Sequence, residues 1–535
     1  MDSSRLTEIK RNQTMAAFVK INPSMNNFKS ELEVLHKNVG GEHVLFEGRL
    51  VSMQPAEDDD IYKINTNKPT QEELIQKDIM IAIEELFVYM ASSSPNPGPT
   101  ICSRIMYLFF FSITSSYNGI VGGKTGINDN WNWSKSYSLG DNTLYKWIQQ
   151  TISYCLPKII PGWGNGLTTF TAAFTKFSND WDVWFALRNL DNGQVGGSAR
   201  AQPTSAQVPN IGIFLDVNAS QNIAGFPEED EWTPLSFNAG VSKQNYLTYG
   251  WGTVISPSLS AGNETFILSL NSTPAYPAGA TRDTEILDLF NLSETLTDTQ
   301  KVIAEFWEGG ANTITPPGMC LWFWKEYIIS QDIKNLNILF FSGLDLTIAI
   351  FEASRLCWNV KGLNRQARPI QEIRRKYATL RARSRKYDGT DIDTRLWVPY
   401  QKPTFVTPPF PDFPSGHSTF SQMFAQVMTD WFGSNIQTQK VQAPFSQLSL
   451  LSPILQTSQS GPFGTFTIPI GSSTIQPGVV PSNTITLSFT SWQQMADQAG
   501  LSRQYGGIHA ASAHSGGQAL ANAIRPVQKA NWPLK

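Results

Sequence analysis

The sequence predicts a mainly α-helical protein whose helices are interrupted by two long irregular regions. Apolar residues recur with helical periodicity in segments near both ends and in the middle of the chain. Residues 179–281 and 441–490 are instead rich in Gly, Pro, Ser, Asn or Thr, which is typical of loops and short strands. With 535 residues, 41% hydrophobic content, 16 Trp and 31 Phe, the chain can bury a large core.

The first third of the chain contains two predicted helices. Residues 73–90 (ELIQKDIMIAIEELFVYM) have helical periodicity and belong to a predicted N-terminal helical extension, residues 1–95. Residues 105–123 carry no charge, but their second half is rich in Ser, Gly and Asn. Because a membrane span needs about 20 predominantly apolar residues, we expect a buried core helix and no membrane span. In residues 179–281 we expect loops with short strands at IGIFLDV and ETFILSL.

The helical pattern returns in the second half. It covers residues 282–309 and 333–356, and the latter segment is apolar enough for a central helix of a helical core that spans residues 333–535. Residues 441–490 contain no charged side chain, which favours a solvent-facing or partly packed insertion. The alternative is a contact between copies of the chain, since interfaces favour uncharged surface. A helical pattern resumes at SWQQMADQAGLSRQYGGIH and runs close to the C-terminus.

Charge, cysteines and the N-terminus exclude several classes. A net charge of -3 gives no overall field that favours nucleic acid. The four cysteines lie far apart without a C-x-x-C, so we expect neither a zinc site nor a disulfide framework. The N-terminal MDSSRLTEIKRNQ has no apolar stretch, and we therefore expect a soluble chain without a classical signal peptide, in an undetermined compartment.

Three short patterns occur in order in the second half of the chain. They are KGLNRQARP with Lys361 and Arg368, then PSGH with Ser415, Gly416 and His417, and then SRQYGGIH with Arg503 and His509. Each pattern alone is common, but their joint, ordered presence is specific. The chain has only five histidines, and two of them fall on these positions.

This set of residues suits a tetrahedral or trigonal-bipyramidal oxyanion. Lys361, Arg368 and Arg503 supply positive charge, and arginines donate in forks to oxyanions. Ser415 and Gly416 precede a helix expected from about Ser418, and a helix N-terminus offers free N–H groups to an anion. Glycine would also let the backbone approach the anion closely. Two histidines then remain as apical ligand or nucleophile and as proton-transfer group.

The three patterns resemble the signature shared by vanadium-dependent haloperoxidases and type 2 phosphatidic acid phosphatases. Further segments resemble soluble haloperoxidase-type proteins, among them GPTICSRIMYLFFFSITSSYNG, IAEFWEGGANTITPPG and TLSFTSWQQMADQAGLSRQYGGIH. The resemblance implies a single haloperoxidase-like domain over residues 1–535. It also implies two packed four-helix bundles with long insertions, and a site at the end of one bundle.

The resemblance also implies roles for individual residues. His509 would coordinate vanadium, and His417 would act as acid and base on the opposite side. The oxyanion, vanadate or phosphate, would be held by Lys361, Arg368, Ser415, Gly416 and Arg503. The lysine would polarise peroxide in such a site, and halide, bromide or chloride, would be oxidised to a hypohalous species that halogenates an organic acceptor.

Neighbouring residues of the motifs are assigned by the same resemblance. Trp358 and Phe410 match apolar residues on the halide side, and Phe410 is closer to the fungal chloroperoxidase pattern than to the histidine of algal bromoperoxidases. Glu308 would stand in for a carboxylate that pairs with the second arginine. Family members usually carry an Asp within four or five residues after the last histidine, whereas this chain has His514 and no acid there. We therefore expect either weakened vanadate affinity or a carboxylate that reaches the site from elsewhere, since such a partner orients the imidazole.

Two other functions remain open on the sequence. The same residues can hydrolyse phosphate esters as a soluble acid phosphatase, with a phosphohistidine at His509. A catalytically degenerate binding or structural protein is the other alternative, since residues 365–386 hold nine Lys or Arg and a single Glu. In the near-neutral chain we favour a solvated helix for this basic run and no nucleic-acid partner.

Overall fold

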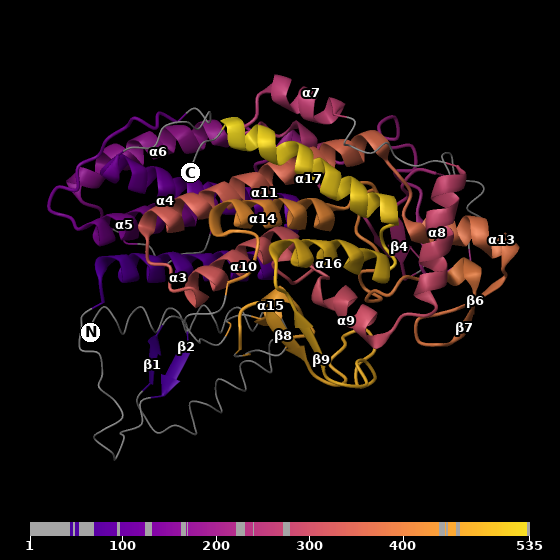
Figure 1. Ribbon diagram of the computed structural model, residues 1–535. Coiled ribbons are helices and arrows are strands. Elements are labelled where there is room, and N and C mark those ends of the chain that lie inside the picture. The colour runs from indigo at the N-terminus through magenta and orange to yellow at the C-terminus, as the bar shows by residue number, and fades with distance from the viewer. Residues whose placement is uncertain are drawn as a thin grey trace, which may run out of the picture.

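Figure 1 shows a computed structural model of the protein, in which long helices pack side by side. The structure describes residues 43–46, 49–52, 69–93, 97–122, 131–161, 167, 169–220, 230–238, 240–270, 279–437, 445, 448–455, 459 and 461–531. Within these ranges the protein is mostly helical, as predicted.

The long helices form two packed groups of four in the described part of the chain. The first group contains α3 (Gln71–Ser92), α4 (Gly98–Val121), α5 (Leu144–Ile159) and α10 (Thr315–Ser330). The second contains α11 (Leu336–Asn364), α14 (Gly416–Phe432), α16 (Trp492–Tyr505) and α17 (Ala511–Asn531). Helix α11 joins the groups because it packs against α4 on one side and against α14 and α17 on the other. The prediction of packed helical bundles is therefore confirmed.

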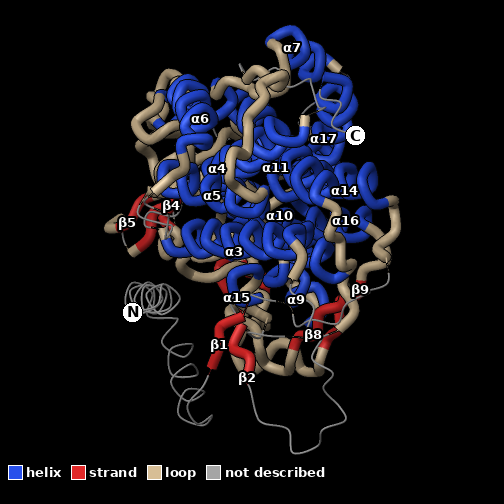
Figure 2. Tube along the Cα trace, turned by 90° about the vertical axis from the view of Figure 1, so that its left-hand side faces the viewer, coloured by secondary structure: helices blue, strands red, loops and turns tan. Residues whose placement is uncertain are grey.

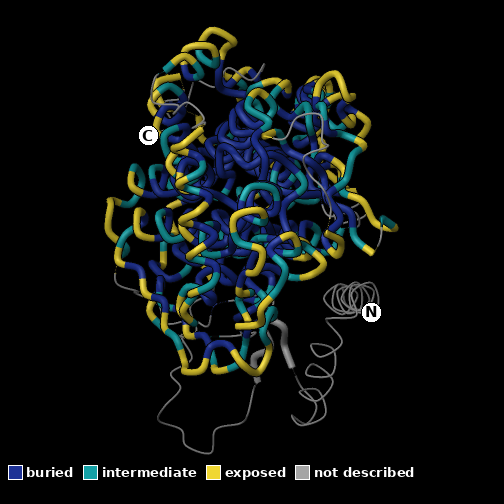
Figure 3. The backbone as a smooth tube through the Cα atoms, turned by 90° about the vertical axis from the view of Figure 1, so that its right-hand side faces the viewer, coloured by how far each residue is buried: buried dark blue, intermediate teal, exposed yellow. Residues whose placement is uncertain are grey.

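Aromatic packing holds α11 against α4. The rings of Tyr107 and Phe351 stack with centroids 5.3 Å apart, and those of Tyr117 and Phe340 stack at 4.3 Å. Gly343 lies so close to Phe110 that an added Cβ would come within 2.0 Å of its ring. Helix α11 is long and apolar enough to cross a membrane by length and composition, but 89% of its most apolar window is buried inside the protein. Figure 3 shows this buried interior running through the bundles.

Shorter helices surround the bundles, and Figure 2 shows α7 and the β8–β9 hairpin at opposite edges. These helices are α6 (Thr175–Arg188), α7 (Ala261–Ser269), α8 (Ala280–Ser293), α9 (Asp298–Phe306), α12 (Pro369–Glu372), α13 (Ala378–Leu380) and α15 (Leu448–Leu451). Single 3-10 turns occur at η2 (Ala172–Phe174), η3 (Ser198–Arg200), η5 (Tyr249–Thr253) and η7 (Thr394–Leu396), and η6 (Ile373–Tyr377) is a π turn.

The strands are short and lie outside the bundles. Two-stranded antiparallel pairs join β1 (His43–Phe46) to β2 (Arg49–Ser52), β6 (Arg383–Arg385) to β7 (Asp391–Asp393), and β8 (Thr465–Ile468) to β9 (Ile485–Ser488). A three-stranded sheet places β4 (Leu235–Phe237) between β3 (Leu215–Asp216), which is parallel to it, and the antiparallel β5 (Ser242–Lys243).

Several local predictions were wrong. The ETFILSL run belongs to α7, whose N-cap Ser260 accepts a hydrogen bond from the N–H of Asn263 (3.2 Å). An apolar run this short does not separate helix from strand by periodicity. The segment predicted as helical at 282–309 is two helices, because Thr297 begins α9 with a capping box. Of the predicted N-terminal helical extension, α3 is helical and residues 43–52 include a hairpin; residues 1–42 lie outside the described residues.

The basic run does not form the solvated helix that we expected. It continues from the end of α11 through α12, η6 and α13 into β6. Arg368 and Arg374 are buried, and the guanidinium of Arg374 donates to the carbonyl oxygens of Asp216 (2.9 Å), Val217 (2.8 Å) and Trp397 (2.9 Å). These interactions attach the segment to the β3–β4 sheet, at the end of the bundles where α8, α13 and the β6–β7 hairpin gather in Figure 1.

Candidate active site

Lys361 lies in the last turn of α11 and is completely buried. Its Nζ donates to the carbonyl oxygens of Pro411 (2.7 Å) and Asp412 (3.0 Å), in the loop that precedes α14. Burial lowers the pKa of Lys361 to about 7, because the charged ammonium loses its hydration. The loop backbone therefore fixes an amine that titrates near neutral pH.

Arg368 is the N-cap residue of α12 and reaches the same loop. Its Nε donates to the carbonyl oxygen of Phe410 (2.8 Å) and its Nη1 to that of Ile508 (2.8 Å). The same Nη1 lies 3.2 Å from Nε2 of His509. Burial lowers the pKa of Arg368 to about 10, and its Nη2 is buried without a hydrogen-bond partner in the described part of the protein. A buried guanidinium donor without a partner needs an acceptor such as an anion.

The PSGH motif lies at the start of α14, as predicted. Ser415 is the N-cap, and its side chain accepts a hydrogen bond from the N–H of Ser418 (3.4 Å). Its own N–H donates to the carbonyl oxygen of Ala513 (2.8 Å), which ties the motif to the start of α17. A Cβ at Gly416 would meet its nearest neighbours, Phe420 and Trp358, at ordinary distances of 3.5 and 3.7 Å. Protein packing alone therefore does not require glycine at this position.

His417 is held in a neutral form with a defined tautomer. Its Nε2 lies 2.8 Å from the carbonyl oxygen of Trp307, so this nitrogen must carry the proton that it donates. Burial, together with the charge of Arg503, lowers the pKa of His417 well below 6.5. Nδ1 of the neutral ring is then the nitrogen left to accept a proton.

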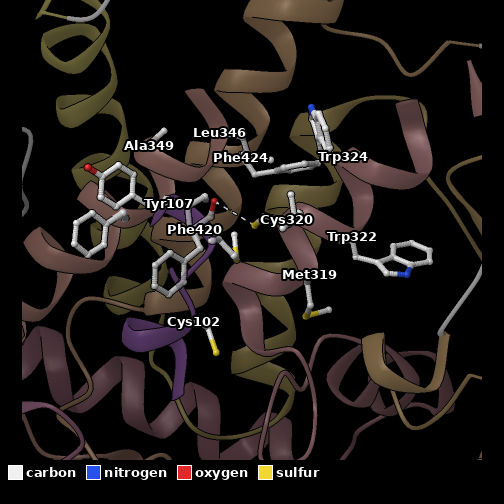
Figure 4. Close-up of a cluster of buried hydrophobic side chains, with 14 of the residues drawn as sticks. Cys102, Tyr107, Met319, Cys320, Trp322, Trp324, Leu346, Ala349, Phe420 and Phe424 are labelled. Carbon is white, nitrogen blue, oxygen red and sulfur yellow. Dashed lines mark hydrogen bonds between the residues drawn. The ribbon is translucent and has the colours of Figure 1, made fainter. Parts of the chain in front are cut away.

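An apolar cavity lies beside His417. Figure 4 shows part of its wall, where the thiol of Cys320 approaches the carbonyl oxygen of Phe420 at 3.8 Å. The cavity is lined by Trp307, Pro316, Met319, Cys320, Phe323, His417, Phe420, Ser421, Phe424, Met495, Ala496 and Ala499. One side of His417 therefore faces mainly aromatic and sulfur-containing side chains.

Arg503 lies in the last turn of α16 and is fixed by the end of α9. It donates through Nη2 to the carbonyl oxygen of Ala304 (2.7 Å) and through Nη1 to that of Glu308 (3.0 Å). Burial lowers the pKa of Arg503 to about 10. The expected carboxylate pairing of Glu308 with this arginine is not formed, because the Glu308 carboxylate is in an ion pair with Lys402 (2.7 Å).

His509 has a carboxylate partner after all, and it comes from the loop before α14. Nδ1 of His509 is hydrogen-bonded to Oδ1 of Asp412. Burial and the adjacent Arg368 lower the pKa of His509 to about 3, whereas His509 and the nearby guanidinium groups hold the pKa of Asp412 below its usual value despite its burial. A carboxylate therefore accepts the Nδ1 proton of a neutral imidazole. His514, which stands where an acid was expected, does not replace it, since its Nδ1 lies 2.9 Å from Oγ of Ser418.

Asp412 was missed in the sequence, together with Arg282, which holds it, and Glu372, which in turn holds Arg282. Its Oδ2 accepts from Nη2 of Arg282 (3.0 Å), and the same Nη2 donates to Oε1 of Glu372 (2.6 Å). Asp412 stands three residues before Ser415, so a candidate carboxylate was visible in PDFPSGH. No sequence pattern indicates, however, that this loop faces the loop that follows α16, or that α8 reaches both.

Trp358 and Phe410 form an apolar wall next to the cations. Their ring centroids lie 4.8 Å apart, and the indole N–H of Trp358 donates to the carbonyl oxygen of Leu247 (3.0 Å). Nζ of Lys361 and Cζ of Arg368 lie 5.0 and 5.1 Å from the centroid of Phe410. The structure thus places both predicted halide-side residues against two of the predicted anion-binding residues.

The assembled side chains suit an oxyanion. Lys361, Arg368 and Arg503 are buried with depressed pKa values, and an anion between them would restore the electrostatic stabilisation that water no longer provides. Nη2 of Arg368 is a buried donor without a hydrogen-bond partner among the described residues, and the start of α14 adds the N–H groups of a helix N-terminus. Among the described residues, no three His, Cys, Asp or Glu side chains cluster to hold a metal ion. The donor set, one imidazole with cationic side chains, therefore fits vanadate or phosphate.

Comparisons with known proteins agree with this architecture. Residues 342–530 match the family model of the VCPO second helical-bundle domain. These residues correspond to the helix group α11, α14, α16 and α17. Among curated proteins, no sequence matches the chain.

Solved structures of similar fold include vanadium-dependent haloperoxidases. A holo-type bacterial vanadium-dependent chloroperoxidase has 14% identity and a TM-score of 0.56, over 81% of this chain and 93% of that one. Its apo-type structure has a TM-score of 0.55 with the same identity, over 81% and 95%. A bacterial vanadium-dependent iodoperoxidase has 16% identity and a TM-score of 0.55, over 86% and 98%. The likeness extends over most of each chain and concerns the fold.

Proposed function

We propose a function on the premise that this chain belongs, by its fold, to the superfamily of vanadium-dependent haloperoxidases and type 2 phosphatidic acid phosphatases: it binds vanadate and oxidises halide with hydrogen peroxide. The proposal is supported by three buried cations, Lys361, Arg368 and Arg503, and by the neutral imidazole of His509, whose pKa is lowered by burial and by Arg368 and Lys361. A buried cation cluster of this kind would bind an oxyanion in preference to an uncharged substrate.

Each residue would have a distinct role. His509 would use Nε2 as the ligand to vanadium, since its Nδ1 proton is bound to Asp412. The oxygens of the anion would be held by Lys361, Arg368, Arg503, Ser415 and the N–H of Gly416. His417 would accept and return a proton at Nδ1, because Nε2 is committed to the Trp307 carbonyl. Vanadate, when bound, supplies the Lewis acidity that activates hydrogen peroxide toward halide, and the hypohalous product halogenates an organic acceptor.

The apolar wall favours halide oxidation. Trp358 and Phe410 shield one side of the cations from water, and a weakly hydrated anion such as bromide or chloride tolerates such a surface. A soluble acid phosphatase would use the same oxyanion-binding groups, with His509 as nucleophile and His417 protonating the leaving alcohol. Assays for both activities therefore belong in one experiment.

The basic run gives little support to a nucleic-acid-binding protein. Arg365 pairs with Glu231 (2.7 Å) and Arg375 with Asp230 (2.5 Å). Lys376 and Arg381 form ion pairs with acidic residues on or next to α8. Paired side chains release few counterions on binding, so we expect no strong, salt-dependent affinity for DNA.

The test uses the full chain, stripped of metal and reconstituted with orthovanadate. We expect peroxide-dependent halogenation of a dimedone substrate with bromide or chloride, and its loss in His509→Ala. His514→Ala is the matched control, because it removes a histidine bonded to Ser418 and outside the cation cluster, and it should retain activity. A parallel assay follows p-nitrophenyl phosphate hydrolysis without vanadate. Phosphate hydrolysis alone would move the assignment to a phosphatase, and silence in both assays would contradict an enzymatic role.

A further inference from the structure

A chain of buried, alternating charges leads away from His509. Asp412 links His509 to Arg282, and Arg282 links Asp412 to Glu372 through Nε (2.9 Å) and Nη2 (2.6 Å). These four residues, His509, Asp412, Arg282 and Glu372, are each at most 2% exposed. Lys376, which is only partly buried, follows Glu372 at 3.5 Å. The chain thus connects the candidate ligand to α8, an element that contributes no residue to the three sequence motifs.

The two oxygens of Asp412 have separate partners. Oδ1 is bonded to Nδ1 of His509, and Oδ2 accepts from Nη2 of Arg282. The backbone of Asp412 is also held. Its N–H donates to the carbonyl oxygen of Gln366 (3.0 Å), and its carbonyl oxygen accepts from Nζ of Lys361 (3.0 Å). The carboxylate therefore has little freedom to turn, and it presents only an acceptor to the imidazole.

This arrangement selects one tautomer of His509. A carboxylate at Nδ1 requires that Nδ1 carry the proton, which leaves Nε2 without one. Nη1 of Arg368 lies 3.2 Å from Nε2 and 3.5 Å from Nδ1, so this contact does not by itself select one ring nitrogen. Asp412 thus favours the tautomer in which Nε2 keeps its electron pair for a ligand bond.

We propose that Arg282 is a positioning residue of this site: by occupying Oδ2 of Asp412, it fixes the orientation of Asp412 and thereby keeps Nε2 of His509 unprotonated. The proposal rests on the proposed oxyanion-binding function and deepens it. In this chain, Asp412 and Arg282 would orient the His509 imidazole, a task that an acid shortly after the last motif histidine would otherwise perform.

The free-energy cost of burying these charges argues against a purely structural role for them. Removing an Asp, an Arg and a Glu from water costs more than apolar packing of similar volume. An apolar cluster that includes Ile286, Ile370 and Ile373 lies on the same elements, so apolar side chains are readily accommodated there. The buried charges therefore call for a functional reason, and the orientation of His509 supplies one.

Asp412→Asn tests the proposal because Arg282 can only donate hydrogen bonds. In this variant Arg282 would select the amide oxygen and turn the amide N–H2 group toward His509. Nδ1 would then have to accept, and the proton would move to Nε2. We expect a change of tautomer at His509 and a 10- to 100-fold loss of vanadate affinity, about the effect of removing a partner of a metal ligand.

The readout is nitrogen-15 NMR of vanadate-free protein labelled at histidine. The chain has five histidines, so the His509 signals can be assigned with His509→Gln. The double variant Asp412→Asn with Arg282→Gln should recover the original tautomer, since glutamine can accept from the amide and lets it turn. Asp345→Asn is the matched control, because Asp345 is also buried against an arginine, Arg525 (2.7 Å), but on α11 and α17.

Three results would overturn the proposal. If the spectrum of the wild-type protein shows the His509 proton on Nε2, the proposal is contradicted. This test needs no variant and therefore holds even if the substitutions prevent folding. An unchanged tautomer in Asp412→Asn would contradict the role of the carboxylate. A double variant that stays in the altered tautomer would contradict the role of Arg282. Failure of vanadate uptake in wild-type protein, with the expected tautomers observed, would instead count against the proposed function alone.

Discussion

Burial changes the charge state of individual side chains in the candidate site. Lys361 is strongly affected, because its ammonium is completely enclosed and is held by two carbonyl groups. Its pKa of about 7 lies well below the usual value for lysine. Arg368 and Arg503 also lose basicity through burial but stay charged near neutral pH. Lys361 is therefore the cation of the site whose charge depends on pH in the physiological range.

The first prediction concerns the pH dependence of oxyanion binding. Above pH 7 the anion-free protein must take up a proton at Lys361 before the ammonium can contact the anion. Vanadate or phosphate affinity should therefore fall as pH rises, by up to about tenfold per pH unit. Calorimetric titrations between pH 6 and 9 measure this slope. Lys361→Met should bind more weakly with a shallower slope that reports only the titration of the ligand; identical slopes would contradict the prediction.

At the scale of elements, backbone carbonyl groups at the end of α9 hold two residues of the candidate site, Arg503 and His417. The carbonyl oxygens of Ala304 and Glu308 hold Arg503, and that of Trp307 holds His417. Glu305, between them, is buried and binds the uncharged insertion. Its Oε1 accepts from the hydroxyl of Tyr400 (2.6 Å), and its Oε2 accepts from the N–H of Thr474 (2.7 Å). The insertion is therefore partly packed, and it stabilises the element that positions the site.

The second prediction tests this support with Glu305→Gln. The amide N–H2 group would replace one acceptor oxygen and leave buried donors without partners, at a cost of about 3 kcal/mol. Urea denaturation of the vanadate-free protein measures the loss, and vanadate affinity should fall with it. Asp298→Asn is the matched control at the other end of α9, where the carboxylate accepts from Ser482 (2.7 Å) at the surface. It should cost about 1 kcal/mol or less, and equal effects of both substitutions would contradict the prediction.

At the scale of the whole molecule, the site lies where separate parts of the chain meet. Helices α11, α14 and α16 of the second group bring Lys361, His417 and Arg503, and α12 with its preceding turn brings Arg368. Helix α8, from outside both groups, adds Arg282. Because these elements converge on a cluster of buried cations, an anion bound there should stabilise the entire fold.

The third prediction is that orthovanadate raises the thermal stability of the protein. An anion that binds only the folded state stabilises it by about 2.7 kcal/mol at a concentration 100 times its Kd. We therefore expect a rise in Tm of a few degrees by calorimetry, with sodium nitrate as the salt control. Arg503→Met should abolish the rise relative to the Tm of the same variant without vanadate, since it removes a buried cation of the candidate site. An equal rise with nitrate would indicate a general salt effect and contradict site-specific binding.

The candidate site could largely be predicted from sequence because its residues occur in short, ordered patterns. Lys361 lies in the last turn of α11 and Arg368 at the N-cap of α12 shortly after it, and PSGH lies at the start of α14, whose N-cap is Ser415. Helical periodicity likewise predicted α3, α4 and α11, since these helices are long enough for the pattern to be unambiguous. The segment that forms α7 and the turns of the basic run are too short for helical periodicity to be unambiguous.

Local sequence by itself therefore determined the helical fold class and the cationic residues of the candidate site, because both follow from patterns within a few turns of helix. Only the tertiary structure decided which carboxylate serves His509. Asp412 and Arg282 lie 97 and 227 residues from it in sequence order (509 − 412 and 509 − 282). Asp412 contacts His509, and Arg282 contacts Asp412, only because the loop before α14 and helix α8 fold onto the end of α16. The same packing directed the Glu308 carboxylate to Lys402 instead of Arg503. Hydrogen bonds between distant segments leave no periodic trace in sequence, which is why the orientation of the imidazole was open until the elements were placed.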